Sequence, residues 1–167
     1  MLQLKDLPDA KILAKFAERY PDADIERVIQ FLTLLRVGSD LSSVLDNFLD
    51  GYGLLQGRWW VLILLMREDD LMSTPSSLAE KAGVSRATMT GLIDGLVREE
   101  LVHRVTNMDD RRKLHIKLTA LGQAKLDEVM PEYYRRVGDL MSVLSDEQGG
   151  QLSSMLTKLQ NNSDVFK

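Results

Sequence analysis

Hydrogen-bonding and cationic side chains are concentrated between positions 85 and 113. One group lies on a helical pattern and comprises Ser85, Arg86, Ala87, Thr88, Thr90 and Arg98. A second group lies in a charged loop and comprises Asp110, Arg111, Arg112 and Lys113. Arginine can bridge the acceptor atoms of guanine, Lys and Arg neutralise phosphates, and threonine can donate through its hydroxyl or contact thymine through its methyl group. These residue types predict a surface that binds double-stranded DNA.

The first group requires a helix with an outward polar face. Ser85 can cap this helix by accepting a hydrogen bond from an amide of its first turn, and the pattern extends to about Glu99. Its apolar stripe comprises Met89, Leu92, Ile93, Leu96 and Val97. At about 100° per residue, the opposite face presents Ala87, Thr88, Thr90, Gly91, Asp94, Gly95 and Arg98. Because most of these side chains are small, the backbone can approach DNA closely, and we expect Ser85 and Thr88 to hold phosphates.

A shorter helix is predicted just before the polar one. Ser77 and Glu80 have the S-x-x-E spacing of a capping box, and the apolar residues that follow form one short face. Gly83 can supply a sharp turn between the two helices because it tolerates a left-handed backbone. The segment is therefore predicted to be a helix-turn-helix.

The second group requires a hairpin. Apolar and polar residues alternate over 101–106 and again over 114–118, which is typical of strands. The connection 107–113 is too long and too charged for a tight turn, and it places the basic residues near its tip. We expect residues 101–118 to form a two-stranded basic wing.

The remaining chain is predicted to be helical. Expected helices are 10–18, 24–49 with Asp24 as its cap, 58–68, one that begins at Thr119 and contains Pro131, and 151–160 after a turn at 145–150. Pro131 should kink its helix or be accommodated by a local break. The first helix fits either an arm that wraps a partner subunit or a frayed terminus. The terminal helices are apolar without a visible partner in the same chain, so a symmetric homodimer is the simplest way to bury them.

The composition limits the class of protein. The 167 residues suffice for one core-bearing domain with interaction helices, and 44% hydrophobic and 28% charged residues are ordinary for a globular protein. The chain has no cysteine, which excludes disulfides, thiolate nucleophiles and thiol-based redox sensing. The longest uninterrupted apolar run, Trp59–Met66, is too short to span a bilayer, so we expect a cytoplasmic protein without a membrane partner.

Charge is distributed unevenly along the chain. The net charge is −4, but residues 81–117 contain eight Lys or Arg and five Asp or Glu, a local excess of +3 that leaves −7 elsewhere. Phosphate neutralisation supplies most of the sequence-independent affinity for DNA. An acidic body with one basic surface therefore suits a protein that touches DNA through a single face.

The order of these elements resembles the multiple antibiotic resistance regulator (MarR) family of winged-helix transcription factors. The most specific match is D-x-R-x5-L-T-x-x-G, formed here by Asp110, Arg112, Leu118, Thr119 and Gly122. The resemblance implies a mainly α fold with a small β-hairpin wing, dimerisation regions at 1–50 and 119–167, and a DNA-binding domain at 51–118. It also implies a homodimeric repressor on a pseudo-palindromic operator with half-sites about one helical turn apart. Arg112 would act at the wing tip with Asp110 as its orienting carboxylate.

The resemblance further implies an effector, a small aromatic or lipophilic anion that releases the repressor. Such ligands lodge between the dimer helices and the helix-turn-helix in the family. The residues with suitable chemistry are Tyr52, Arg58, Trp59 and Trp60, with Arg58 as the anion partner. The alternative is that the aromatic pair belongs to the core, because the helix over 58–68 is apolar almost all round.

Two departures from the family pattern concern the polar helix. Gly91 and Gly95 stand where many relatives have a basic residue, and Glu100 stands where relatives usually end the helix with glycine. The base preferences of relatives therefore do not transfer, and a different helix ending is expected in place of the left-handed glycine cap.

Other functions have less support. His103 and His115 fall on the two wing strands, but a zinc site needs further ligands, so no metal is expected. No nucleophile-base pattern, phosphate loop or carboxylate pair indicates an enzyme or a bound cofactor. The remaining alternative is a winged-helix module that docks on protein without sequence-specific DNA binding, which the overall acidity and the two helix glycines would favour.

Overall fold

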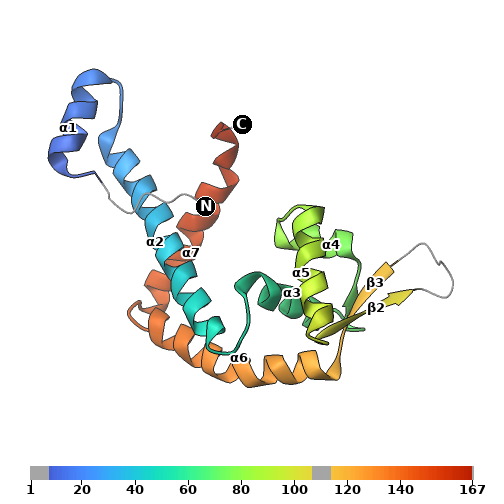
Figure 1. The fold of residues 1–167 in the computed structure, drawn as a ribbon. Coiled ribbons are helices and arrows are strands. Elements are labelled where there is room, and N and C mark those ends of the chain that lie inside the picture. The colour runs from blue at the N-terminus through green and yellow to red at the C-terminus, as the bar shows by residue number, and fades with distance from the viewer. Residues whose placement is uncertain (1–7, 107–113, 167) are drawn as a thin grey trace. The chain divides into compact units, whose positions relative to one another are not determined.

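The computed structural model describes residues 8–106 and 114–166, and the chain divides into two compact units, Met1–Val61 and Leu62–Lys167. Helices account for most of both units, and one small sheet lies in the second (Figure 1). The predicted fold class, mainly α with a β-hairpin wing, is confirmed.

The first unit is helical. It contains α1 (Ala10–Arg19), α2 (Ile25–Asp50) and the part of α3 (Gln56–Met66) that precedes Leu62. Asp9 and Asp24 cap α1 and α2, since each carboxylate accepts a hydrogen bond from the amide three residues later, at 2.8 and 3.1 Å. Both helices confirm the sequence prediction, and α2 continues through Gly38.

Most apolar side chains of α2 are exposed in the single chain. Its most apolar window has a mean hydropathy of 1.3 and is 0% buried, so α2 could cross a membrane by length and composition alone, although no uninterrupted apolar run indicated this. Arg36 and Asp40 nevertheless form an ion pair at 2.6 Å within the helix. Ionisable groups are costly in a bilayer-spanning segment, so this ion pair disfavours a membrane-spanning role for α2.

The second unit contains the helix-turn-helix, the sheet and the C-terminal helices. Its elements are the remainder of α3, β1 (Met72–Ser73), α4 (Pro75–Ala82), α5 (Arg86–Arg98), β2 (Val102–Thr106), β3 (Leu114–Leu118), α6 (Ala120–Met141), α7 (Asp146–Asn161) and a 3-10 turn, Ser163–Phe166. The sheet is antiparallel with the order β1-β3-β2. The third strand, β1, was missed because two residues are too few to show alternation.

Three helices begin earlier than predicted. α3 was expected over 58–68 and instead begins at Gln56 and ends at Met66. α4 begins at Pro75 after Thr74, whose hydroxyl accepts from the Ser77 amide at 3.2 Å, so the expected cap at Ser77 is wrong. α7 begins at Asp146, and the turn expected over 145–150 is its first part. The Ser145 and Gln148 side chains form a capping box there, which satisfies two backbone amides.

Of the two outcomes expected at Pro131, a kink or a local break, the structure contradicts the break. Pro131 lies inside α6, which is assigned as one helix over Ala120–Met141 without a break. The predicted cap is confirmed, because the Gly122 amide donates to the Thr119 hydroxyl at 2.9 Å.

The core of the second unit lies beneath the helix-turn-helix and the sheet. Its deeply buried side chains include Leu62, Leu65, Leu78, Met89, Ile93, Leu96, Ile116, Leu126 and Val129. They come from α3, α4, α5, β3 and α6. Because side chains from all these elements are buried together, one face of α5 packs against the core and its other face is exposed to solvent.

Candidate nucleic-acid interface

α5 presents the predicted polar surface. Its six candidate residues, Ser85, Arg86, Ala87, Thr88, Thr90 and Arg98, are all exposed. Ser85 caps the helix as predicted, accepting a hydrogen bond from the Thr88 amide at 3.1 Å, and the two hydroxyl oxygens lie 2.9 Å apart. The Thr90 hydroxyl donates to the Arg86 carbonyl at 2.9 Å. The N-terminal turn therefore offers hydroxyl groups held close to the helix.

The opposite face of α5 forms the predicted apolar stripe. Met89, Ile93 and Leu96 are buried, whereas Leu92 and Val97 are half-buried. Gly95 is buried too, so its predicted place on the outward face is wrong. It lies three residues after Leu92, and about 100° per residue puts it only about 60° from that residue, at the edge of the stripe.

The turn between α4 and α5 depends on Gly83. Its φ of +65° is left-handed, and its amide donates to the Glu80 carbonyl at 3.1 Å. The next amide, of Val84, donates to the Ala79 carbonyl at 3.0 Å. These bonds satisfy carbonyl groups at the end of α4, and the predicted turn is confirmed.

α5 ends with the conformation that glycine usually provides. Glu100 has a φ of +60°, and its amide donates to the Val97 carbonyl at 3.1 Å. The Leu101 amide donates to the Leu96 carbonyl at 3.0 Å, which completes a Schellman motif. The expectation of a different helix ending is therefore wrong, because the glutamate itself takes the left-handed conformation.

Of the predicted wing, the structure describes the two strands. β2 and β3 pair with Arg104 opposite Ile116 and His103 opposite Lys117. The charged candidates of the loop, Asp110, Arg111, Arg112 and Lys113, lie outside the described residues. Thr119 follows β3, and its hydroxyl lies 2.8 Å from the Glu100 carbonyl oxygen and 3.0 Å from that of Leu101. This hydroxyl joins the end of α5 to the start of α6.

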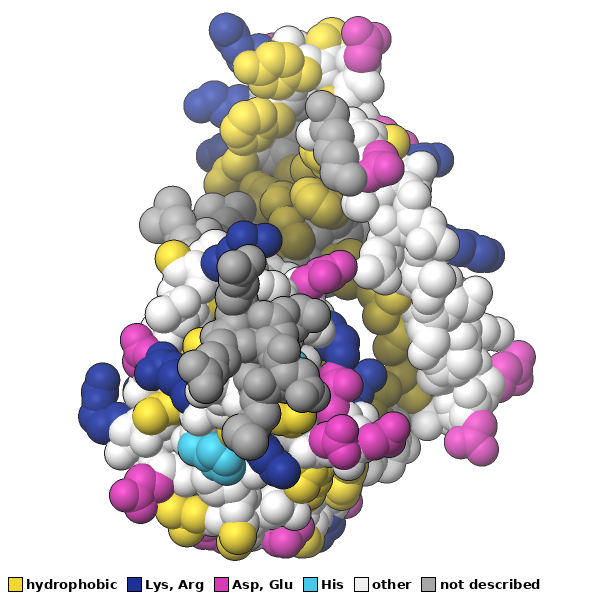
Figure 2. Space-filling model, turned by 90° about the vertical axis from the view of Figure 1, so that its right-hand side faces the viewer, with side chains coloured by type: hydrophobic (Ala, Val, Ile, Leu, Met, Phe, Trp, Pro, Cys, Tyr) yellow, Lys and Arg dark blue, Asp and Glu magenta, His cyan; other side chains and the backbone are white. Residues whose placement is uncertain are grey.

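Two ion pairs around the helix-turn-helix were missed by sequence reasoning. Arg104 of β2 pairs with Asp94 of α5, and Lys81 of α4 pairs with Glu68, which follows α3. In each pair the partners are at least ten positions apart, so neither pair has a local sequence signal. On the face shown in Figure 2, Lys and Arg side chains are interspersed with Asp and Glu.

The aromatic candidates lie in the first unit and differ in exposure. Trp59 is 1% exposed and belongs to the buried set, whereas Trp60 is 41% exposed. Their ring centroids are 4.5 Å apart. Tyr52 packs edge-on against Phe48 at 5.2 Å, and Arg58 is half-buried. The burial of Trp59 favours the core interpretation for that residue.

The two histidines of the wing strands have no cluster of further metal ligands among the described residues. Within residues 8–106 and 114–166, no group of three His, Cys, Asp or Glu side chains is placed to hold a metal ion. His115 lies opposite Val105 and His103 opposite Lys117, so neither faces the other directly in the strand register.

Comparison with known proteins agrees with this geometry. The sequence model of the MarR family matches residues 56–114. The repressor YetL of Bacillus subtilis (strain 168), described as an HTH-type transcriptional repressor, is 34% identical over 166 residues, which is 99% of each chain.

Solved structures show the same fold. The crystal structure of AbsC, a MarR family transcriptional regulator from Streptomyces coelicolor, superposes with a TM-score of 0.75 at 23% identity over 86% of this chain and 95% of AbsC. The MepR–DNA complex of S. aureus superposes with a TM-score of 0.69 at 20% identity over 78% and 94% of the respective chains. The fold, the outward face of α5 and the full-length identity to YetL establish that this chain belongs to the MarR family of winged helix-turn-helix transcriptional regulators.

Proposed function

We propose that the protein is a cytoplasmic homodimeric repressor that inserts α5 of each subunit into the major groove of a pseudo-palindromic operator. The observation that carries this proposal is the outward face of α5, which combines small side chains with exposed hydroxyl and guanidinium groups. Small side chains allow the backbone to approach base edges, and the polar groups supply hydrogen bonds once it has done so. The relatives are named as regulators rather than enzymes, which agrees with a binding function.

Each candidate residue has a proposed role. Ser85 and Thr88 at the start of α5 would bind phosphates, since helix amides and hydroxyl groups there favour anions. Arg86 and Thr90 would contact bases. Ala87 and Arg98 would line the groove. The loop residues Asp110, Arg111, Arg112 and Lys113 would contact the minor groove or backbone, with Arg112 inserted and Asp110 orienting it.

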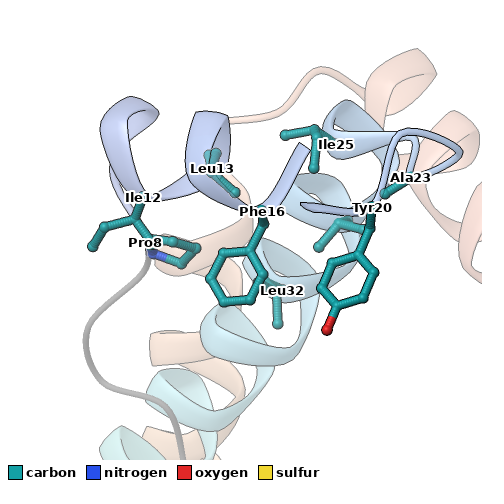
Figure 3. Close-up of a pocket in the computed structure, with 9 residues that line it drawn as sticks. Pro8, Ile12, Leu13, Phe16, Tyr20, Ala23, Ile25 and Leu32 are labelled. Atoms are coloured by element: carbon teal, nitrogen blue, oxygen red, sulfur yellow. The ribbon is translucent and has the colours of Figure 1, made fainter. Parts of the chain in front are cut away.

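The homodimer is supported by apolar surfaces that the single chain leaves uncovered. Along α7, the side chains of Leu152, Met155, Leu156 and Leu159 are all exposed in one stripe. A separate groove of about 480 Å³ lies between α1 and α2 and is lined by Ile12, Phe16, Tyr20, Leu32 and neighbouring apolar residues (Figure 3). A second copy that covers such surfaces would remove them from water. We therefore assign dimerisation to 1–50 and 119–167 and DNA binding to 51–118.

DNA binding can be tested with a wing variant. The wild-type protein should bind duplex DNA taken from upstream of its own reading frame, and affinity should fall steeply with salt. Arg112→Ala should weaken binding and reduce the salt slope by about 0.9 per lost phosphate contact. Arg27→Ala is the charge-matched control, because this side chain is 84% exposed on α2, outside the helix-turn-helix. Absence of duplex binding at low salt would contradict the proposal, and a salt-tolerant complex with protein instead would favour the protein-docking module.

The dimer can be tested separately by its mass in solution. Sedimentation equilibrium should give twice the mass of the 18.9 kDa chain. Leu156→Asp places a charge in the apolar stripe of α7 and should shift the equilibrium to the monomer. A wild-type protein that stays monomeric at micromolar concentration would remove the symmetric-operator part of the proposal.

A second proposal concerns a small aromatic or lipophilic anion as effector. Trp60 supports it, because a large aromatic ring that remains 41% exposed beside a buried one is a suitable ligand contact. Arg58 would pair with the anion and Tyr52 would complete the aromatic lining, while Trp59 supports the site from the core. Salicylate and similar phenolic anions should raise the melting temperature of the wild-type protein, and Trp60→Ala should abolish the rise. No shift with any such anion would contradict the effector proposal and leave DNA binding untouched.

A further inference from the structure

Asp94 is a carboxylate in the middle of the face that we propose to contact DNA. It is the one acidic residue of α5, whose sequence over Arg86–Arg98 is RATMTGLIDGLVR. It is exposed and lies one turn after Thr90 and Gly91 and one turn before Arg98. A free carboxylate at this position would face phosphate groups of like charge, which opposes binding.

Arg104 forms an ion pair with Asp94. Arg104 projects from β2 and is paired in the sheet with Ile116 of β3, so the guanidinium group comes from a strand that is held in register. The two side chains are 42% and 48% exposed. Ion pairs at this exposure contribute little to folding, because solvent screens them and two side chains must be ordered. Stability is therefore a poor explanation for this contact.

We infer that Arg104 is a positioning residue for DNA binding, which neutralises Asp94 and holds its carboxylate against β2 and away from the groove. This inference rests on the proposed DNA-binding function. With the pair intact, the middle of α5 carries no net charge, and the hydroxyl and guanidinium groups on either side can approach phosphates and bases. With Arg104 lost, the same helix carries an unpaired negative charge at its centre.

The inference differs from two other roles for these side chains. If Arg104 contacted a phosphate directly, its loss would weaken binding whether or not Asp94 was charged. If Asp94 accepted a hydrogen bond from cytosine N4, as carboxylates can, its neutralisation would weaken binding to one sequence in particular. The charge states of the two residues therefore have to be changed singly and together.

The experiment measures binding of four full-length proteins to two DNA probes. The proteins are the wild type, Arg104→Gln, Asp94→Asn and the double variant Asp94→Asn/Arg104→Gln. The probes are a duplex from upstream of the reading frame and sonicated calf thymus DNA. Arg104→Gln should lower affinity for both probes about fivefold to tenfold, because a carboxylate is left opposite phosphates. The double variant, which has no charge at either position, should return to within about twofold of the wild type.

The single variant Asp94→Asn is an independent test, because its affinity for DNA should change in the opposite direction to that of Arg104→Gln. It frees Arg104 beside the DNA, so affinity for calf thymus DNA should rise and the salt slope should steepen by about 0.9. Arg104→Lys keeps the positive charge and should bind within about twofold of the wild type, which rules out an unfolded variant as the cause of a loss. Circular dichroism spectra and unfolding midpoints of all variants should match that of the wild type.

Two results would overturn the inference. A double variant as weak as Arg104→Gln would make Arg104 a direct DNA contact, and a loss of binding by Asp94→Asn restricted to the upstream duplex would make Asp94 a base reader. Failure of the wild type to bind either probe would instead refute the proposed function. The two failures are therefore distinguishable.

Discussion

A Cβ atom on Gly122 would lie 2.2 Å from the carbonyl oxygen of Leu101 and 2.7 Å from a methyl carbon of Leu118. The first turn of α6 thus lies directly against the backbone that follows α5. Thr119 contacts the same carbonyl through its hydroxyl. The L-T-x-x-G part of the family motif has a structural reason here, since it packs α6 onto the end of the DNA-binding helix.

Gly122→Ala should destabilise the protein. No side chain fits without moving backbone atoms, so the expected loss is about 1–3 kcal/mol, as for an overpacked core. Urea unfolding followed by circular dichroism measures it. Gly91→Ala is the control, because Gly91 is also helical and a methyl group there would meet no atom within 4 Å. Equal unfolding midpoints for Gly122→Ala and the wild type would show that α6 can move away without cost.

From the sequence, the packing of α6 against the end of α5 was visible only as the L-T-x-x-G motif, without its structural reason. The caps at Ser85 and Thr119 were predictable, because a hydroxyl followed by an apolar helical stripe is a local signal. The contact between Gly122 and Leu101 was not, because it depends on how two elements pack. The same limit explains why the ion pair between Asp94 and Arg104 was missed.

Glu100→Gly should stabilise the protein. Glu100 has a φ of +60°, which is unfavourable for a side chain with a Cβ atom and ordinary for glycine. The relief is partly offset by the greater freedom of glycine in the unfolded chain, so the net gain should be about 0.5–1 kcal/mol. Thermal and urea unfolding measure the gain. Glu100→Ala keeps the Cβ atom and should show no such gain; if both variants behaved alike, backbone strain would not be the cause.

Errors in the predicted helix starts have a local cause. Several residues before α4 can act as caps, and Ser77 with Glu80 gave the more complete capping-box pattern. The structure instead uses Thr74, because Pro75 fits the first helical position, where no amide hydrogen is needed. At α7 a turn was predicted over 145–150, but Ser145 and Gln148 form a capping box there and the helix begins at Asp146.

Ionisation of Glu132 should make the free energy of unfolding depend on pH in the acid range. Arg135 and Arg136 donate hydrogen bonds to its carboxylate at 2.7–2.8 Å and hold its pKa at about 2, below the ordinary value of 4.5. A lowered pKa means that the unfolded chain binds the proton more readily. The contribution of Glu132 is therefore complete above pH 4.5 and is lost as pH falls towards 2.

The matching variant is Glu132→Gln, which cannot ionise. The difference in free energy of unfolding between the wild type and Glu132→Gln should be constant above pH 4.5 and shrink as pH falls from 4.5 to about 2. The shrinkage should weaken in 1 M salt, because the Debye length there is about 3 Å and the group is exposed. A difference that stays constant through this pH window would show that the arginines do not favour the ionised form.

Substitutions at Gly91 should affect stability and DNA binding in opposite directions, so the two properties can be separated at one position. It lies on the outward face of α5 with open space around it, so alanine or leucine should raise the free energy of unfolding by about 1 kcal/mol through helix propensity. The same side chains should keep α5 away from the groove. Misfit of this kind costs about 1–3 kcal/mol, which is about fivefold to 150-fold in affinity. Gly91→Leu should therefore bind the upstream duplex more weakly than Gly91→Ala while both unfold at higher urea than the wild type. Undiminished binding by Gly91→Leu would mean that this part of α5 does not approach the DNA.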